Sequence, residues 1–126
     1  MFALCIVHAN AAAVIPSDLF GEWLLDKADF DRAVMAGGMG IYAIYITTDG
    51  AGAAILAPIR VDVKLSVAYD ITARLLTLSV GREKPCDLRY DSTVKTLKVQ
   101  KTETCEALTF RRGRAQVPDD ILEMVK

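Results

Sequence analysis

The segment Ile59–Tyr69 constrains the fold more than any other part of the sequence. Every second residue is apolar, whereas most of the residues between them are polar. The apolar positions are Ile59, Val61, Val63, Leu65, Val67 and Tyr69. A period of two is typical of a β-strand with one face in a core and the other in water. Parallel strands, which are covered on both faces, do not alternate so cleanly. We therefore expect an antiparallel sheet.

Turn signals divide the rest of the chain into further short strands. An Asp-x-Thr sequence occurs at Asp70 and again twenty-one residues later at Asp91. Short polar side chains of this kind hydrogen-bond to nearby backbone and favour turns. Asp49-Gly50 predicts a third hairpin. The strands expected besides Ile59–Tyr69 are Glu22–Asp26, Ile41–Ile46, Ala53–Ala57, Leu75–Val80, the two runs beside Asp91, and Glu106–Arg111.

About eight short strands joined by tight turns predict a mainly β fold. An antiparallel up-and-down β-barrel over residues 14–116 removes exposed sheet edges; a two-sheet sandwich is the structural alternative. The length of 126 residues suits one domain, and 52% of the residues are hydrophobic. No apolar run reaches the length of a membrane helix. The net charge of −1 gives no general attraction to nucleic acid or acidic lipid.

Two segments have helical patterns. One short helix is expected over Lys27–Ala36, after the first strand, because Phe30 and Val34 share a face and Gly37 follows its end. A second is expected in the C-terminal tail, residues 117–126, where Pro118 precedes two acids. We interpret Asp119 and Asp120 as helix caps, not as a catalytic acid–base pair.

Residues 1–13 form an apolar segment with two interpretations. An Ala-x-Ala arrangement at Ala11–Ala13 is typical of an export signal, but no Lys or Arg precedes the apolar stretch. The other interpretation is an apolar segment packed on the domain. A signal would make the protein secreted or periplasmic, and a packed segment would favour the cytoplasm.

Cysteine positions bear on the same question. Cys86 and Cys105 are expected at the same end of the sheet with one strand between them. Two strand spacings make roughly 9.6 Å, which is beyond the reach of a disulfide unless loops bend together. We therefore expect free, buried thiols, with a bridge as the alternative.

Residues for common catalytic sites are scarce. His8 is the only histidine, and it lies in the N-terminal segment, so a histidine-based triad or metal site has little to build on. The chain contains no Cys-x-x-Cys, Gly-x-Ser-x-Gly or Gly-x-x-x-x-Gly-Lys sequence. We expect no enzyme activity, no cofactor and no metal.

The segment from Leu19 to Gly40 carries a resemblance. Leu19-x-Gly21-x-Trp23 resembles the Gly-x-Trp signature of lipocalins and fatty-acid-binding proteins, and Asp29-Phe30-Asp31 followed by glycines is similar to the first helix of the latter. The resemblance implies an up-and-down barrel that holds a hydrophobic ligand, with Trp23 closing one end. The Arg-x-Tyr carboxylate clamp of fatty-acid-binding proteins is absent from Thr109–Gly113.

The function we expect is therefore binding of a small hydrophobic ligand without turnover. Candidate ligand contacts are Trp23, Tyr42, Tyr69, Tyr90, Phe110 and Arg112. Arg112 shares the parity of Phe110 and could meet a ligand carboxylate, but a solvated rim of Arg111, Arg112 and Arg114 is the favoured interpretation.

An eight-stranded barrel either holds one ligand or is filled by its own side chains. A filled barrel would favour the alternative function, a small exported protein-interaction or inhibitor domain. Residues 89–114 carry seven basic and three acidic residues, but only Tyr90 and Phe110 could stack on bases, so nucleic-acid binding is disfavoured.

Overall fold

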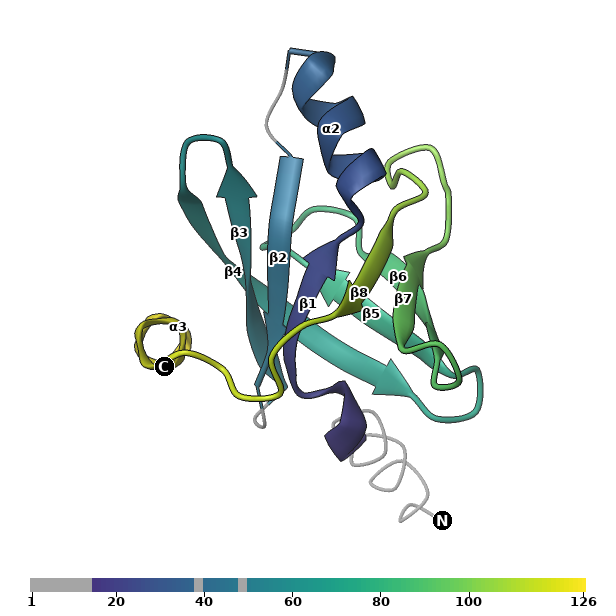
Figure 1. The fold of residues 1–126 in the computed structure, drawn as a ribbon. Coiled ribbons are helices and arrows are strands. Elements are labelled where there is room, and N and C mark those ends of the chain that lie inside the picture. Colours follow the sequence, from purple (N-terminus) through teal and green to yellow (C-terminus); the bar gives the residue numbers. More distant parts are fainter. Residues whose placement is uncertain (1–14, 38–39, 48–49) are drawn as a thin grey trace, which may run out of the picture.

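The barrel is closed by eight antiparallel strands (Figure 1). The computed structural model describes residues 15–37, 40–47 and 50–126, so the predictions for Cys5, His8 and residues 1–13 lie outside the described residues. Each strand pairs with the next, and the last pairs with the first, which confirms the predicted up-and-down barrel and excludes the sandwich. The strands are β1 Gly21–Leu25, β2 Gly40–Ile46, β3 Ala51–Ala57, β4 Val61–Asp70, β5 Leu75–Ser79, β6 Cys86–Asp91, β7 Thr96–Val99 and β8 Thr109–Arg112.

The alternation that predicted an antiparallel sheet is the inward–outward alternation of β4. Leu65, Val67 and Tyr69 are buried in the core, whereas the residues between them are exposed. The predicted strand starts too early, because Ile59 lies in the turn before β4 and is 73% exposed. The apolar face of β4 therefore meets the core from Val63 onward, whereas Val61 is exposed.

The two Asp-x-Thr sequences form equivalent turns, as predicted. The Asp70 carboxylate accepts a hydrogen bond from the backbone N of Thr72, and Asp91 does the same for Thr93, both at 2.9 Å. Arg74 and Lys95, again twenty-one residues apart, both adopt a left-handed backbone with φ of 57°. The repeat therefore reflects two hairpins with the same turn geometry, β4–β5 and β6–β7.

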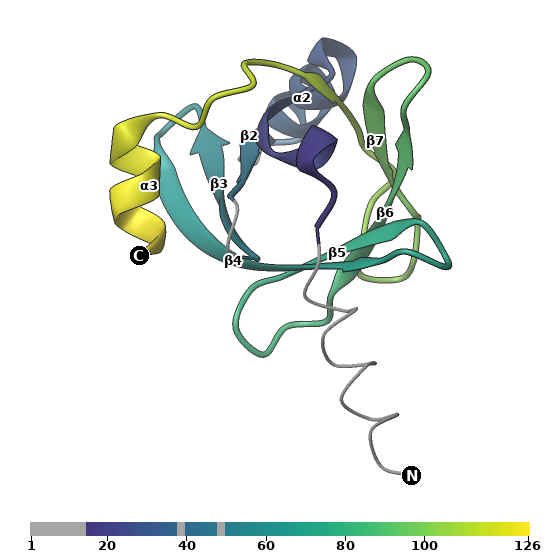
Figure 2. The same cartoon turned by 90° about the horizontal axis from the view of Figure 1, so that it is seen from below.

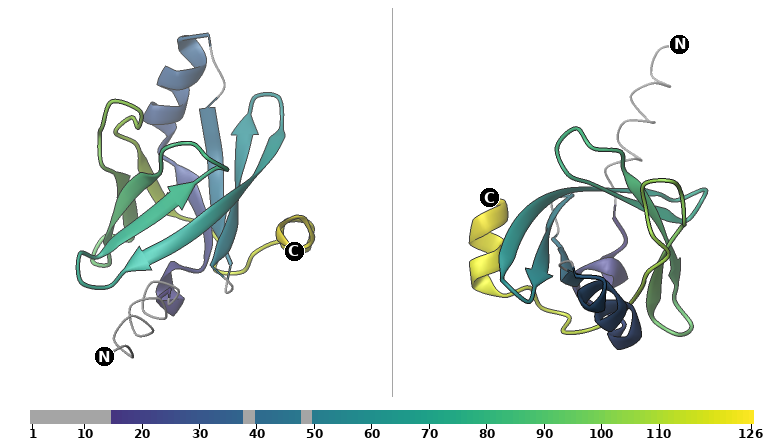
Figure 3. Two further views of the ribbon diagram at one scale, coloured as in Figure 1. Left: turned by 180° about the vertical axis from the view of Figure 1, so that it is seen from behind. Right: turned by 90° about the horizontal axis from the view of Figure 1, so that it is seen from above.

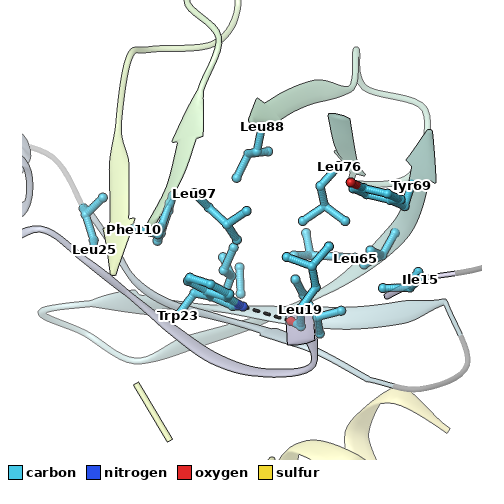
Figure 4. Close-up of a cluster of buried hydrophobic side chains, with 14 residues drawn as sticks. Ile15, Leu19, Trp23, Leu25, Leu65, Tyr69, Leu76, Leu88, Leu97 and Phe110 are labelled. Carbon is cyan, nitrogen blue, oxygen red and sulfur yellow. Dashed lines mark hydrogen bonds between the residues drawn. The ribbon is translucent and has the colours of Figure 1, made fainter. Parts of the chain in front are cut away.

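Trp23 fills one end of the barrel, which we call the closed end. Its side chain has no exposed surface, and its Nε1 donates a hydrogen bond of 2.9 Å to the Leu19 carbonyl in the 3₁₀ helix η1, Ser17–Leu19. Seen along the barrel, η1 lies across this end (Figure 2). Leu19, Leu76 and Leu97 belong to the same buried cluster as the indole (Figure 4). This part of the main core fills the closed end, and the rest of the same cluster continues towards the other end of the barrel.

The predicted first helix is α2, Lys27–Met35, and it lies at the opposite end of the barrel (Figure 3). Two contacts attach it to β8: the Asp29 carboxylate accepts a hydrogen bond from Thr109 N, and Asp26 N donates to Thr109 O. The Phe30 ring packs closely against Gly40, where a Cβ would lie only 3.0 Å from the ring. These contacts position α2 beside the barrel opening.

The strand β8 begins at Thr109, so the predicted start at Glu106 is wrong. Residues 100–108 instead form a long connection, the β7–β8 loop, at the same end of the barrel as α2 (Figure 1). The loop has its own turn, in which Thr102 N donates to the Cys105 carbonyl at 2.9 Å. Residues that would have extended the sheet are therefore used to build the rim of the opening.

The C-terminal helix α3, Asp119–Val125, packs on the outside of the barrel. Val117 and Ile121 cover a second apolar cluster on the outer face of β2 and β3, which includes Tyr45 and Ile55. The predicted cap is wrong, because Pro118 is the N-cap residue and no side chain caps the helix; Asp120 instead pairs with Arg60 at 3.2 Å. Among the described residues, neither α2 nor α3 has the length and apolar character needed to cross a membrane.

An ion pair between the buried Glu22 and the exposed Arg114 holds the segment that leads to α3. The Glu22 carboxylate, on the outer face of β1, accepts hydrogen bonds from the Tyr45 hydroxyl at 2.8 Å and from Arg114 Nη2 at 3.0 Å. Glu22 is only 5% exposed, and a Cβ on Gly113 would lie 2.5 Å from its Oε1. A glycine at 113 therefore lets the chain pass directly over the buried carboxylate.

The Glu22 network predicts an acid-sensitive contribution to stability. Hydrogen bonds from Arg114 outweigh burial and lower the pKa of Glu22 from 4.5 to about 2. A carboxyl with a lowered folded-state pKa stabilises the fold above its unfolded pKa, and this contribution is lost as the pH falls from about 4.5 towards about 2. We expect Glu22→Gln to lower the free energy of unfolding at pH 7 by on the order of 2 kcal/mol.

Urea unfolding measured across this pH range checks the expectation. The difference between wild type and Glu22→Gln should shrink as the pH falls, whereas Glu83→Gln, at an exposed carboxylate with no ion pair among the described residues, should match wild type throughout. A constant difference between wild type and Glu22→Gln at every pH would contradict the lowered pKa.

Candidate ligand-binding cavity

A cavity of about 610 Å³ occupies the end of the barrel opposite Trp23. Its inner wall consists of buried apolar side chains that point inward from six different strands: Leu25, Ile44, Ala54, Leu65, Leu88 and Phe110. Each of these residues lies on the inward face of its strand, since alternate residues of a strand point into and out of the barrel. The barrel is therefore filled at one end and hollow at the other.

The mouth of the cavity is built from α2 and two loops. Ala33 of α2 lines one side. The β5–β6 loop, residues 80–85, contributes Glu83 and Lys84, and the β7–β8 loop contributes Thr104 and Glu106. Apart from the bridged cysteines, these four residues and Ser79 at the end of β5 are the polar residues of the described lining. The wall is thus apolar inside and polar at the rim.

A disulfide joins the two cysteines of the mouth, so the expectation of free thiols is wrong. Cys86 and Cys105 are bridged with their Cα atoms 5.9 Å apart, and both line the cavity. The strand-spacing argument failed because Cys105 lies in a loop and not on a strand. That loop folds over the barrel end and brings Cys105 back to the first residue of β6. The bridge therefore connects the β7–β8 loop to β6, the strand on the other side of β7.

Of the six predicted ligand contacts, the structure places only Phe110 in the cavity wall. Tyr69 is buried in the core, and Tyr90 lies edge-on to Trp23 with ring centroids 5.8 Å apart. Burial first, and the Asp18 carboxylate second, raise the pKa of Tyr90. Tyr42 is 51% exposed and packs against Phe30 of α2 on the outside. Trp23, Tyr69 and Tyr90 thus belong to the core and Tyr42 lies outside, so none of the four lines the cavity.

Arg112 belongs to the closed end as well. Its guanidinium carbon lies 4.7 Å from the centroid of the Trp23 ring, and its Nη2 donates a hydrogen bond to the Phe20 carbonyl. The favoured interpretation of Arg112 as part of a solvated rim is therefore wrong, whereas Arg111 is exposed and pairs with Asp26 at 2.9 Å. The alternative, a meeting of Arg112 with a ligand carboxylate, finds no support, because Arg112 does not line the cavity.

Sequence reasoning missed most of the cavity wall. The inward parity of Leu65 was visible in the alternation of β4, and the same test applied to Leu88 and Ile44 would have included them. Lys84 and Glu106 carry no such signal, since each lies in an irregular loop whose path depends on the disulfide. Their position at the mouth follows only from the three-dimensional structure.

Comparison of the chain with protein-family models, with curated proteins and with solved structures gives no match. The resemblance of residues 19–40 to lipocalins and fatty-acid-binding proteins therefore stays a prediction. Within the described part of the chain, no group of three or more histidine, cysteine, aspartate or glutamate side chains is arranged to hold a metal ion.

The disulfide predicts a measurable contribution to stability and to the order of the mouth. A bridge that closes a loop between residues 19 apart in sequence contributes about 3 kcal/mol in the chain-entropy model. We expect the double variant Cys86→Ser with Cys105→Ser to lose about this amount in urea unfolding. Amide hydrogen exchange should become faster in residues 101–107 and stay unchanged in β1 and β2.

Wild-type protein treated with a thiol reductant serves as the matched control, and it should behave like the double variant. Equal stability of the oxidised and reduced forms, with unchanged exchange in the β7–β8 loop, would show that the bridge does not hold this part of the mouth.

Proposed function

We propose that this protein binds a small hydrophobic molecule inside the barrel without converting it chemically. The observation that carries the proposal is the cavity of about 610 Å³ with its apolar inner wall. Ligand sites in proteins typically measure about 300–1,000 Å³ and are lined mainly by apolar side chains with a few polar groups. Removing apolar ligand surface from water contributes roughly 25 cal/mol per Å².

The construction of the mouth supports the same proposal. The walls are held in place before any ligand arrives, by the closed strand ladder, by the disulfide, and by the hydrogen bond from Thr109 N to Asp29 of α2. A preformed site costs less conformational entropy on binding than a site that must be ordered by its ligand. The resemblance of residues 19–40 to lipocalins is consistent with this function.

The alternative function, an exported protein-interaction or inhibitor domain, was expected of a filled barrel. The end of the barrel lined by Leu25, Ile44 and Leu88 holds the cavity and is not filled. A partner protein would then bind the outer surface, and the cavity would have no part in its recognition. The apolar cavity favours the small-molecule function over this alternative.

Filling the cavity tests the proposal. N-phenyl-1-naphthylamine, an uncharged dye whose fluorescence rises in apolar surroundings, should bind the wild type with one-site saturation. Ala54 lies in the inner wall, so Ala54→Leu and Ala54→Phe place progressively more side-chain volume in the cavity. We expect graded loss of dye affinity, reaching about ten-fold or more for Ala54→Phe, which corresponds to roughly 1.4 kcal/mol.

Ala68 provides the matched control, because it is exposed on the outer face of β4. Ala68→Phe should leave dye affinity unchanged, and thermal unfolding followed by circular dichroism should show that each variant retains a cooperative fold. Undiminished dye binding by a folded Ala54→Phe variant, or no dye binding by the wild type, would refute the cavity as the binding site.

A further inference from the structure

We infer that the ligand is an amphiphile that enters the cavity tail first and leaves its polar or charged group at the mouth, within reach of Lys84. The inference rests on the proposed function and adds the chemical class of the ligand and its orientation. It follows from the distribution of polar groups along the cavity wall.

The inner wall offers nothing that could solvate a charge. Leu65, Leu88 and Phe110 are typical of it: all three are buried and apolar, and they come from well-separated strands. Moving a charged group from water to such surroundings without a partner is strongly unfavourable. For a ligand with one charged end, burial of the apolar end therefore favours binding, whereas burial of the charged end disfavours it.

Arg112, whose guanidinium lies near the core, does not change this balance. Arg112 stacks on Trp23 at 4.7 Å and donates to the Phe20 carbonyl, so its guanidinium is already engaged at the closed end. Its Nη1 is completely buried and has no hydrogen-bond partner among the described residues, but Arg112 is absent from the cavity lining. A ligand carboxylate in the cavity would thus find no cation at depth.

The mouth, by contrast, carries charges of both signs. Lys84 and Glu83 come from the β5–β6 loop and Glu106 from the β7–β8 loop, and all three residues line the cavity. They are exposed, and none of them forms an ion pair within the described parts of the chain. An anionic head can approach Lys84, a cationic head can approach the two glutamates, and a zwitterion can use both.

The size of the cavity limits the tail. Because a water molecule occupies about 30 Å³ in the liquid, the cavity of about 610 Å³ corresponds to about 20 waters. A single alkyl chain or a small ring system fits this volume. Recognition is therefore expected to select the tail by size and the head only weakly by charge.

A head-group series tests the orientation. Decanol, decanoate and decylammonium share one tail and differ in charge, and each is titrated against bound N-phenyl-1-naphthylamine. With the head in water, we expect the three affinities to lie within about ten-fold of one another. In carbon-13 NMR, the carboxyl of bound decanoate should titrate within about one pH unit of its value in water, whereas a buried carboxyl would titrate several units higher.

Charge reversal at the mouth provides the second readout. We expect Lys84→Glu to weaken decanoate about two- to five-fold relative to decanol and to favour decylammonium, since exposed charge pairs contribute modest energies. Glu106→Lys should act in the opposite direction. Lys98→Glu makes the same charge change on the exposed outer face of β7 and should leave all three affinities unchanged.

The outcomes separate the two proposals. If N-phenyl-1-naphthylamine and decanol do not bind at all, the proposed function fails and takes the inference with it. If they bind, but decanol binds more than about 100-fold tighter than both ions, the head is buried and the inference is overturned. It is also overturned if Lys84→Glu and Glu106→Lys behave like Lys98→Glu.

Discussion

The packing of Trp23 is the constraint on which the interior of this barrel depends. The indole is fully buried, donates to the Leu19 carbonyl at 2.9 Å and lies under the Arg112 guanidinium at 4.7 Å. These contacts bring η1, β1 and β8 together and fill one end of the barrel. The interior of an eight-stranded barrel is just wide enough for its own side chains or for one small ligand. Because the large side chains gather at one end, the free volume collects at the other.

The open end is shaped by long-range connections and not by regular sheet. Asp29 of α2 accepts a hydrogen bond from Thr109 N, and Cys105 is bridged to Cys86. One contact holds the first residue of β8 and the other holds the loop before it, so together they set the course of the β7–β8 loop along the rim. On the outside, Glu22 holds the segment after β8 through Arg114. The last strand is thus anchored before its start and after its end.

The candidate site was predicted from the sequence only in outline. The inward parity of Phe110 placed it correctly in the cavity wall, whereas the same parity was set aside for Arg112 in favour of a solvated rim, and it gave no sign of the contact with Trp23. Tyr42 was a reasonable aromatic candidate, yet it packs outside against Phe30. Residue type and parity predict which face a side chain takes. They do not predict its height along the barrel, which decides between core and cavity.

The sequence by itself determined the class of fold. The alternation in Ile59–Tyr69 and the turns at Asp70 and Asp91 are local patterns, and local backbone and solvation preferences are sufficient to specify strands, hairpins and an antiparallel order. Only the tertiary structure decided that Cys86 and Cys105 are bridged, that Arg112 faces Trp23, and that a cavity lies beneath α2. These features depend on where irregular loops and strand ends meet in space. Such meetings are set by the packing of residues far apart in the chain, which no local pattern encodes.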